Sequence, residues 1–162
     1  MYPIHDHDAL LLLAISLAAK RRPAEAIEIV AAIDLIQGNV PGENALVATI
    51  DRLGQLGLLC ETDGCLGLTP AAERLVEALS PKGDYPERVF DLRQRLVDYV
   101  PSAGPAIVQD AAVWHAAIVD HRAAGKSGAK NLLMPKPAPE TKAARPGQRQ
   151  RKPLPKAKSR QR

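Results

Sequence analysis

The sequence predicts a mainly α-helical domain that carries one small β-hairpin and is followed by a basic segment. Three observations support this prediction. Apolar side chains recur at steps of three and four residues over much of residues 1–125, which is the spacing of a buried helix face. Asp63-Gly64 separates two short apolar runs and favours the tight turn of a hairpin. Residues 126–162 contain 12 Lys or Arg residues and one acidic residue, a net charge of +11. Residues 1–125 contain 10 Lys or Arg residues and 17 acidic residues, a net charge of −7.

Helix boundaries follow from caps and turn residues. Asp6 or Asp8 can cap the first helix. Pro23 suits the first turn of the second helix, and Gly38 suits its left-handed end. Pro105 can open the last helix. The expected helices span residues 8–19, 23–37, 42–56, 69–79, 85–99 and 105–123, and the expected strands span residues 58–62 and 65–68.

Composition divides the chain into three parts. Residues 1–83 contain the first four helices and the hairpin, and residues 84–124 contain two further helices. Residues 125–162 contain no aromatic residue and six of the 14 prolines. Such a segment has little apolar surface to bury, so we expect it to be a disordered basic tail.

Several classes of protein are excluded by the same composition. The longest apolar run, Ala9 to Ile15, falls far short of the roughly 20 residues of a membrane helix. The start, His5-Asp6-His7-Asp8, lacks the positive region of a signal peptide. Two cysteines form no disulfide framework, so we expect a reduced, cytoplasmic protein. We find no nucleophile–base pair and no phosphate loop, and therefore expect no enzyme and no cofactor.

Three smaller motifs each allow a chemical and a structural interpretation. His5 and His7 can ligate a metal, but two ligands make a weak site, so we expect a helix cap and no metal. Cys60 and Cys65 lie diagonally on one face of the hairpin if its turn has two residues. We expect them to be small buried residues, with a redox switch as the alternative. Trp114 is expected to pack against the body or a second subunit.

The order of the elements resembles a winged helix-turn-helix domain, and particular residues resemble bacterial MarR- and PadR-type transcriptional regulators. The third helix ends in Leu53-Gly54-Gln55-Leu56-Gly57-Leu58-Leu59, similar to the Leu-x-x-Leu-Gly-Leu phrase of those families. After the hairpin comes Leu66-Gly67-Leu68-Thr69-Pro70-Ala71-Ala72-Glu73-Arg74-Leu75, similar to a phrase of the type Leu-Thr-x-x-Gly. Ala72 stands where the families often have Gly. The resemblance covers about residues 8–79.

This resemblance implies a DNA-binding regulator of transcription. The third helix would enter the major groove, and the hairpin would lie along the DNA backbone as a wing. The residues of this helix suited to base contacts are Asn44, Thr49, Arg52 and Gln55. Helices outside the winged core often form a dimer in these families, and the residues expected to form that interface are Phe90, Leu92, Leu96, Trp114 and Ile118.

The charge pattern keeps a second function open. Glu43 and Asp51 on the third helix, and the acidic hairpin tip at residues 61–64, would be repelled by phosphates. They favour an interaction or adaptor module that contacts protein. In either case the basic tail can neutralise phosphates without sequence preference, or contact an acidic partner, or fold back on the acidic body. Its densest cations are Arg149, Arg151, Lys152, Lys156, Lys158 and Arg160.

Overall fold

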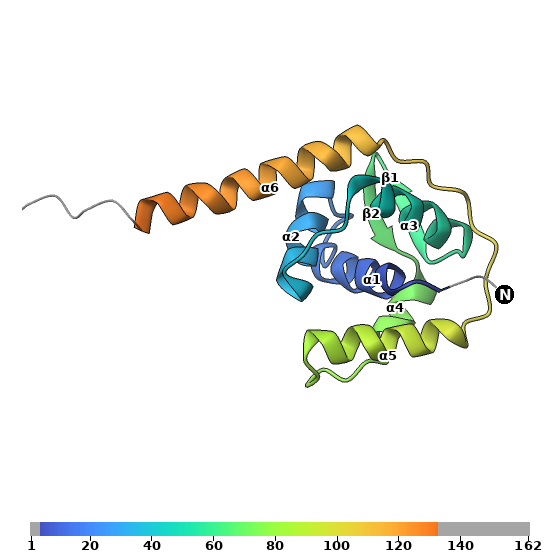
Figure 1. Ribbon diagram of the computed structural model, residues 1–162. Helices are drawn as coiled ribbons and strands as arrows, with labels where there is room; N and C mark the ends of the chain where they lie inside the picture. The colour runs from blue at the N-terminus through green and yellow to red at the C-terminus, as the bar shows by residue number, and fades with distance from the viewer. Residues whose placement is uncertain (1–3, 133–162) are drawn as a thin grey trace, which may run out of the picture.

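The computed structural model describes the backbone of residues 4–132 and the side chains of residues 4–126 (Figure 1). This part of the chain is mainly helical with one two-stranded antiparallel hairpin, as the sequence predicts. In chain order the elements are α1 (Asp6–Ala18), α2 (Ala26–Gln37), α3 (Glu43–Gln55), β1 (Leu59–Thr62), β2 (Cys65–Leu68), α4 (Pro70–Glu77), α5 (Tyr85–Val97) and α6 (Ala111–Leu132). Among these residues, no helix is both long and apolar enough to cross a membrane.

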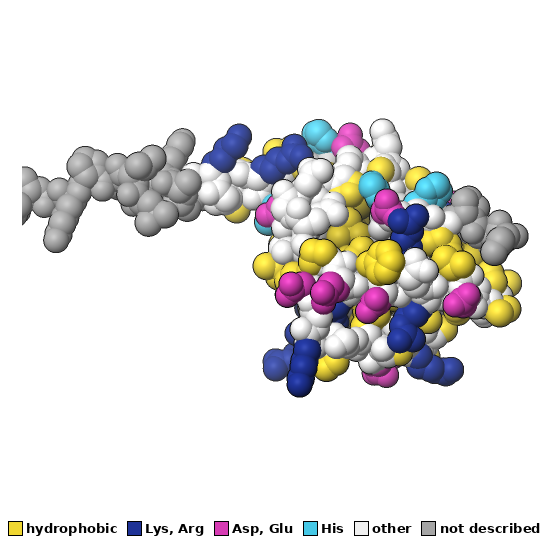
Figure 2. Space-filling view, turned by 60° about the horizontal axis from the view of Figure 1, so that its bottom comes forward, with side chains coloured by type: hydrophobic (Ala, Val, Ile, Leu, Met, Phe, Trp, Pro, Cys, Tyr) yellow, Lys and Arg dark blue, Asp and Glu magenta, His cyan; other side chains and the backbone are white. Residues whose placement is uncertain are grey.

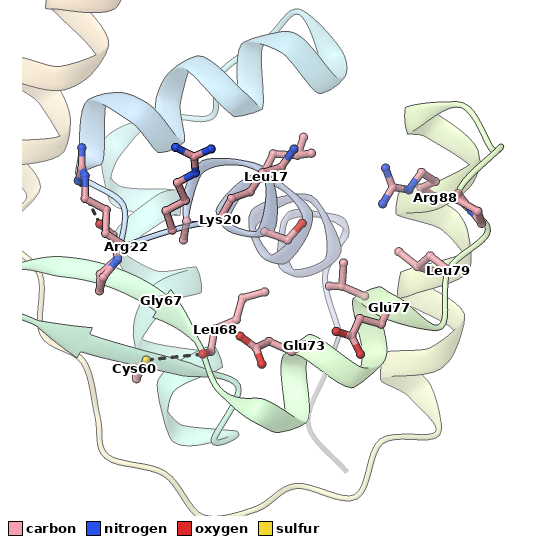
Figure 3. Close-up of a pocket in the computed structure, with 16 residues that line it drawn as sticks. Leu17, Lys20, Arg22, Cys60, Gly67, Leu68, Glu73, Glu77, Leu79 and Arg88 are labelled. Carbon is pink, nitrogen blue, oxygen red and sulfur yellow. Dashed lines mark hydrogen bonds between the residues drawn. The ribbon is translucent and has the colours of Figure 1, made fainter.

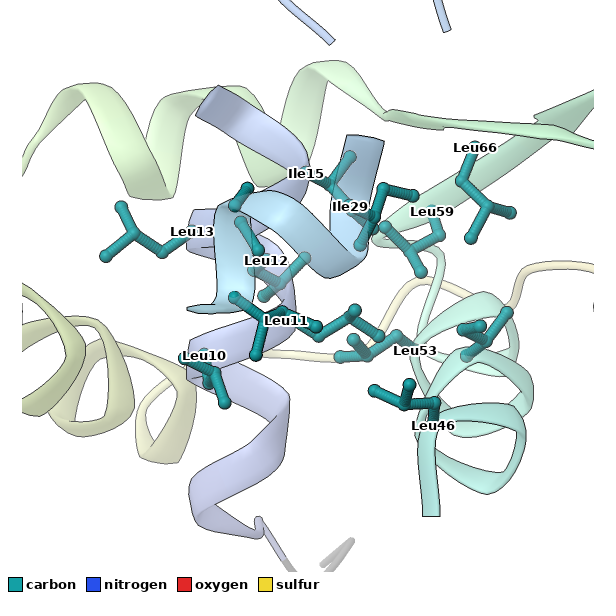
Figure 4. Close-up of a cluster of buried hydrophobic side chains, with 14 of the residues drawn as sticks. Leu10, Leu11, Leu12, Leu13, Ile15, Ile29, Leu46, Leu53, Leu59 and Leu66 are labelled. Carbon is teal, nitrogen blue, oxygen red and sulfur yellow. The ribbon is translucent and has the colours of Figure 1, made fainter. Parts of the chain in front are cut away.

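Helix α1 is the centre of the core. Its residues from Asp8 to Ile15 are all buried, because α2, α3, α4, α5 and β2 contact it from different sides. A helix that is apolar around its whole circumference requires such complete cover. Figure 4 shows Leu13 leaving α1 on the side opposite to Ile15, which points toward Leu59 and Leu66 of the hairpin.

The hairpin has the two-residue turn that the sequence predicts. Thr62 pairs with Cys65, and the two turn residues between them have positive φ angles, 52° at Asp63 and 78° at Gly64. This is the left-handed conformation that Asp-Gly tolerates best. The turn therefore fixes a register in which Leu59 lies opposite Leu68.

A short extended segment before α2 pairs with the hairpin. Ala24 exchanges two backbone hydrogen bonds with Leu66, at 2.8 and 2.9 Å. The expectation that Pro23 opens the second helix is therefore wrong. Pairing with Leu66 keeps the backbone extended at Ala24, and α2 begins at Ala26, where Glu28 accepts a hydrogen bond from the Glu25 amide.

The region after α5 differs from the prediction at both ends. Residues 99–110, which we call the strap, contain no helix and run past the C-terminal end of α3, so Pro105 does not open a helix. Helix α6 begins at Ala111, where the Asp110 carboxylate accepts the Ala112 amide. It continues to Leu132, so residues 125–132, expected to be disordered, are helical. Residues 133–162, the rest of the expected tail, lie outside the described residues.

Helix α6 packs its first turns on α2 and α3 and then projects away from the body (Figure 1). Trp114, Ala117 and Ile118 are buried in this contact. His121 on α6 lies 3.1 Å from the Asp34 carboxylate on α2. The projecting part carries the backbone toward the basic segment.

Candidate nucleic-acid interface

Helix α3 has one side turned to solvent, and that side carries acidic and uncharged side chains. Asn44, Ala48 and Gln55 are exposed on it, and Val47 and Asp51 are half-buried. The Gln55 amide donates a 2.9 Å hydrogen bond to Asp51. No described side chain on this side of α3 is a cation. Asn44 and Gln55 therefore lie where the DNA-binding prediction needs them, but without a positive charge beside them.

Thr49 does not face outward, which corrects the prediction that it contacts bases. Its side chain is buried, with 2% of the residue exposed, and its hydroxyl donates to the carbonyl oxygen of Ala45 at 2.8 Å. The sequence contained a signal for this. Thr49 lies three residues after Leu46 and four before Leu53, so it belongs to the buried stripe of α3.

Arg52 is held by a buried carboxylate instead of being free to reach a base. Its guanidinium donates to Oδ1 of Asp8 at 2.5 and 3.1 Å, and its side chain is 22% exposed. Asp8 is 1% exposed and also accepts the His5 amide at 2.8 Å. A buried carboxylate needs its partner, since an unpaired charge in the interior is costly. Arg52 therefore ties α3 to the start of α1.

The strap lies against the end of α3. The Gly104 amide donates to the Gln55 carbonyl oxygen at 3.1 Å, and the Tyr99 hydroxyl donates to the Leu56 carbonyl oxygen at 3.3 Å. A Cβ added to Gly54 would lie 2.8 Å from Cγ1 of Ile107, so the glycine is needed for this close approach. Together α3 and the strap form a shallow groove of about 450 Å³, lined by Asn44, Val47, Ala48, Asp51, Gln55, Ala106, Ile107 and Val108.

The hairpin tip, like the lining of this groove, contains carboxylates and no cation. Glu61, Thr62, Asp63 and Gly64 are all exposed, and these residues include two carboxylates and no cation. A DNA backbone beside the tip would meet negative charge. Neither the tip nor the outer side of α3 therefore offers phosphates a described cation.

Basic side chains lie elsewhere. Figure 2 shows acidic and basic groups mixed over one face of the body, and basic groups on the projecting part of α6. Arg122 and Lys126 are exposed there. The cations chosen as the strongest phosphate contacts, Arg149, Arg151, Lys152, Lys156, Lys158 and Arg160, lie outside the described residues.

The histidine pair belongs to the start of α1. His5 precedes the helix, and its amide is capped by Asp8. Within residues 4–132, no group of three or more His, Cys, Asp or Glu side chains is placed to hold a metal ion.

Neither cysteine is buried, which corrects the prediction that both are. Cys60 is exposed and Cys65 is half-buried, and both are free thiols. Side chains alternate across a strand. Leu59 and Leu66 fill the core, so Cys60 and its partner Gly67 are on the opposite face of the hairpin.

The residues chosen for a dimer interface do not form one surface. Leu92, Leu96, Trp114 and Ile118 are buried within the core of this chain. Only Phe90 is available, with 60% of the residue exposed. The hydrophobic pattern that suggested an interface is instead explained by packing of α5 and α6 against the body.

Comparison of the sequence with known protein families, with curated proteins and with solved structures finds no match.

Proposed function

We propose that this chain is a non-enzymatic interaction module of winged-helix architecture. In this proposal the outer side of α3 contacts a protein, and the basic segment 126–162 contacts nucleic acid without reading its sequence. The observation that supports it is the separation of charge: α3 and the hairpin tip offer carboxylates and amides, whereas residues 126–162 carry a net charge of +11. The order of elements, and the pairing of Ala24 with Leu66 beside the hairpin, are compatible with a winged helix.

The groove between α3 and the strap supports a protein contact. Val47, Ala48 and the strap residues Ala106 and Val108 line it with apolar groups, and Asn44, Asp51 and Gln55 supply polar groups at its edge. Protein interfaces combine an apolar centre with a polar rim in this way. Phosphate-binding surfaces need cations or free amide groups.

A second candidate is a transcriptional regulator in which α3 reads bases in the major groove. Two observations favour it: the order of the elements, and the exposure of Asn44 and Gln55, whose amides can pair with adenine. In this candidate Thr49 and Arg52 act in holding α3 in place, and the basic segment adds phosphate contacts.

The salt dependence of DNA binding separates the two candidates. The affinity of the full chain for a mixed-sequence DNA duplex is measured at salt concentrations from about 50 to about 300 mM. Counterion release makes the affinity fall measurably over this range. In a tail variant, the six cations Arg149, Arg151, Lys152, Lys156, Lys158 and Arg160 are replaced by Gln. The proposal predicts that the slope of log K against log salt falls by about five, since each phosphate contact contributes about 0.9.

A variant of α3 is the matched control for this measurement. Asn44→Ala combined with Gln55→Ala removes the two exposed amides and leaves the charge unchanged. The proposal expects its affinity and slope to equal those of the unaltered chain. Two results together would support base reading and contradict the proposal. The α3 variant would lose affinity for particular DNA sequences only, and the tail variant would keep the salt slope of the unaltered chain.

A further inference from the structure

An open cavity of about 740 Å³ shares no lining residue with the α3 groove. Figure 3 shows its walls: the end of α1 and the residues after it, the hairpin at Cys60 and Gly67, helix α4, and the start of α5. Leu17, Leu68, Val76 and Leu79 supply apolar groups to these walls. A volume of this size is typical of sites for small molecules.

Cationic side chains stand on two opposite walls of the cavity. Lys20, Arg21 and Arg22 follow α1, and Arg88 comes from α5. Arg22 is already paired with Glu28 at 2.7 Å. Among the described residues, no carboxylate lies within 4 Å of the charged nitrogens of Lys20, Arg21 or Arg88. Three cations therefore line the cavity without an ion-pair partner in the described part of the chain.

Arg88 has the most unusual environment of these cations. Its Nε atom is buried and has no hydrogen-bond partner among the described residues. Figure 3 shows its guanidinium turned from α5 toward the cavity. A buried donor without an acceptor is unfavourable and uncommon in folded proteins. The Nη groups at the end of the same guanidinium are not enclosed in this way, and an anionic group bound in the cavity would accept hydrogen bonds from them.

Two carboxylates restrict which anions fit. Glu73 and Glu77 project from α4 toward the same cavity (Figure 3). They would repel a polyanion such as a nucleic-acid backbone, which carries phosphates at every nucleotide. A molecule with one anionic end and an apolar body avoids them, because its charge can lie at Arg88 while its body contacts Leu17, Val76 and Leu79.

We propose that this cavity binds a small organic anion, a carboxylate or a phosphate monoester with an apolar body. Arg88 holds the anionic group through charge-assisted hydrogen bonds, and Lys20 and Arg21 add positive charge from the opposite wall. This inference is independent of how the chain contacts nucleic acid or protein.

The test uses the full chain labelled with ¹⁵N and titrated with octanoate and with octyl phosphate. The Nε–H signal of Arg88, assigned by its loss in Arg88→Lys, reports on the guanidinium that would hold the anionic group. We expect octanoate, octyl phosphate or both to shift this signal together with the amide signals of Leu17 and Val76. The tighter of the two probes identifies the anionic group.

Variants and neutral probes complete the test. Arg88→Met, which keeps the apolar stem, is expected to weaken binding about tenfold or more, and Arg88→Lys to restore part of it. Arg122→Gln, on the exposed part of α6, is the matched loss of one charge and is expected to change nothing. Octanol and inorganic phosphate, which each lack one half of the ligand, are expected to bind at least tenfold more weakly than the best probe.

Four results would overturn the proposal. One is octanoate binding that is unchanged in Arg88→Met. Another is octanol binding as tightly as the better of the two anionic probes, which would show that only apolar contact matters. The third is a set of shifts confined to the separate apolar cavity beside Leu53, Leu96 and Tyr99. Absence of binding by both anionic probes would contradict it equally.

Discussion

The ion pair between Asp8 and Arg52 gives the sharpest prediction about this fold. Replacing Arg52 by Met removes the charge and keeps most of the apolar stem. It leaves the Asp8 carboxylate, 1% exposed, with the His5 amide as its remaining hydrogen-bond donor among the described residues. Breaking a fully buried pair costs about 3–5 kcal/mol. Because the Arg52 side chain is 22% exposed, screening by water reduces the expected loss of unfolding free energy to about 2–3 kcal/mol.

Urea denaturation followed by circular dichroism measures this loss, and a double-mutant cycle assigns it to the pair. In the cycle, Asp8→Asn is combined with Arg52→Met. We expect the double variant to recover about 2 kcal/mol relative to the sum of the single changes, because it leaves no unpaired buried charge. Arg93→Gln is the matched control. It removes a pair with Asp6 in which the side chains are 45% and 72% exposed, so its cost is expected to be about 0–1 kcal/mol.

A loss below about 1 kcal/mol in Arg52→Met, together with no coupling in the cycle, would show that the ion pair does not stabilise the fold. Arg52 would then be available for other contacts, and its assignment to the interior would be wrong.

Three further predictions concern the turns, the thiols and the strap. Gly57→Ala is expected to lower the unfolding free energy by about 2 kcal/mol or more, because Gly57 has a φ of 72° and an added Cβ would overlap the strap. Gly38→Ala, with a similar φ of 69° and open space around it, should cost only about 1 kcal/mol, and urea denaturation compares the two. A thiol reagent added to the native protein should modify exposed Cys60 before half-buried Cys65, as mass spectrometry of the labelled peptides would show; equal rates would contradict the difference in exposure between the two thiols. Ile107→Ala should cost about 2–4 kcal/mol and accelerate hydrogen exchange of the strap amides, whereas unchanged exchange would show that Ile107 does not hold the strap.

Local sequence signals predicted most of the helices and the hairpin. The Asp63-Gly64 turn, the Gly38 helix end and the Thr69 cap of α4 all depend on residues within a few positions of one another, and all three have the expected geometry. Such features are determined by backbone preferences and short hydrogen bonds, which a single sequence displays.

The errors arose where a distant partner decides the outcome. Ala24 is extended because it pairs with Leu66, 42 positions later, and this pairing overrides the preference of Pro23 for a helix start. The strap packs closely on Gly54 at the end of α3 and on Gly57 just after it, and it is not helical there. Arg52 turns inward because it pairs with Asp8, which precedes it by 44 positions in the sequence. Spacing within one helix cannot reveal such a partner.

The candidate interface was predicted less well than the fold. The acidic character of α3 and the hairpin tip was evident in the sequence, and the structure confirms that Asn44 and Gln55 are exposed. The sequence could not show that the strap lines the groove beside α3. It also gave no reason to group Lys20 and Arg21 with Arg88, which approach one cavity from separate elements.

We propose that the basic segment, and not α3, contacts nucleic acid. The most direct measurement is a ¹⁵N spectrum of the full chain recorded during titration with a short mixed-sequence DNA duplex. We expect the signals of residues 126–162 to shift at low salt, while the side-chain amide signals of Asn44 and Gln55 stay in place. Shifts of those two amide groups, persisting when the tail cations are replaced by Gln, would contradict it.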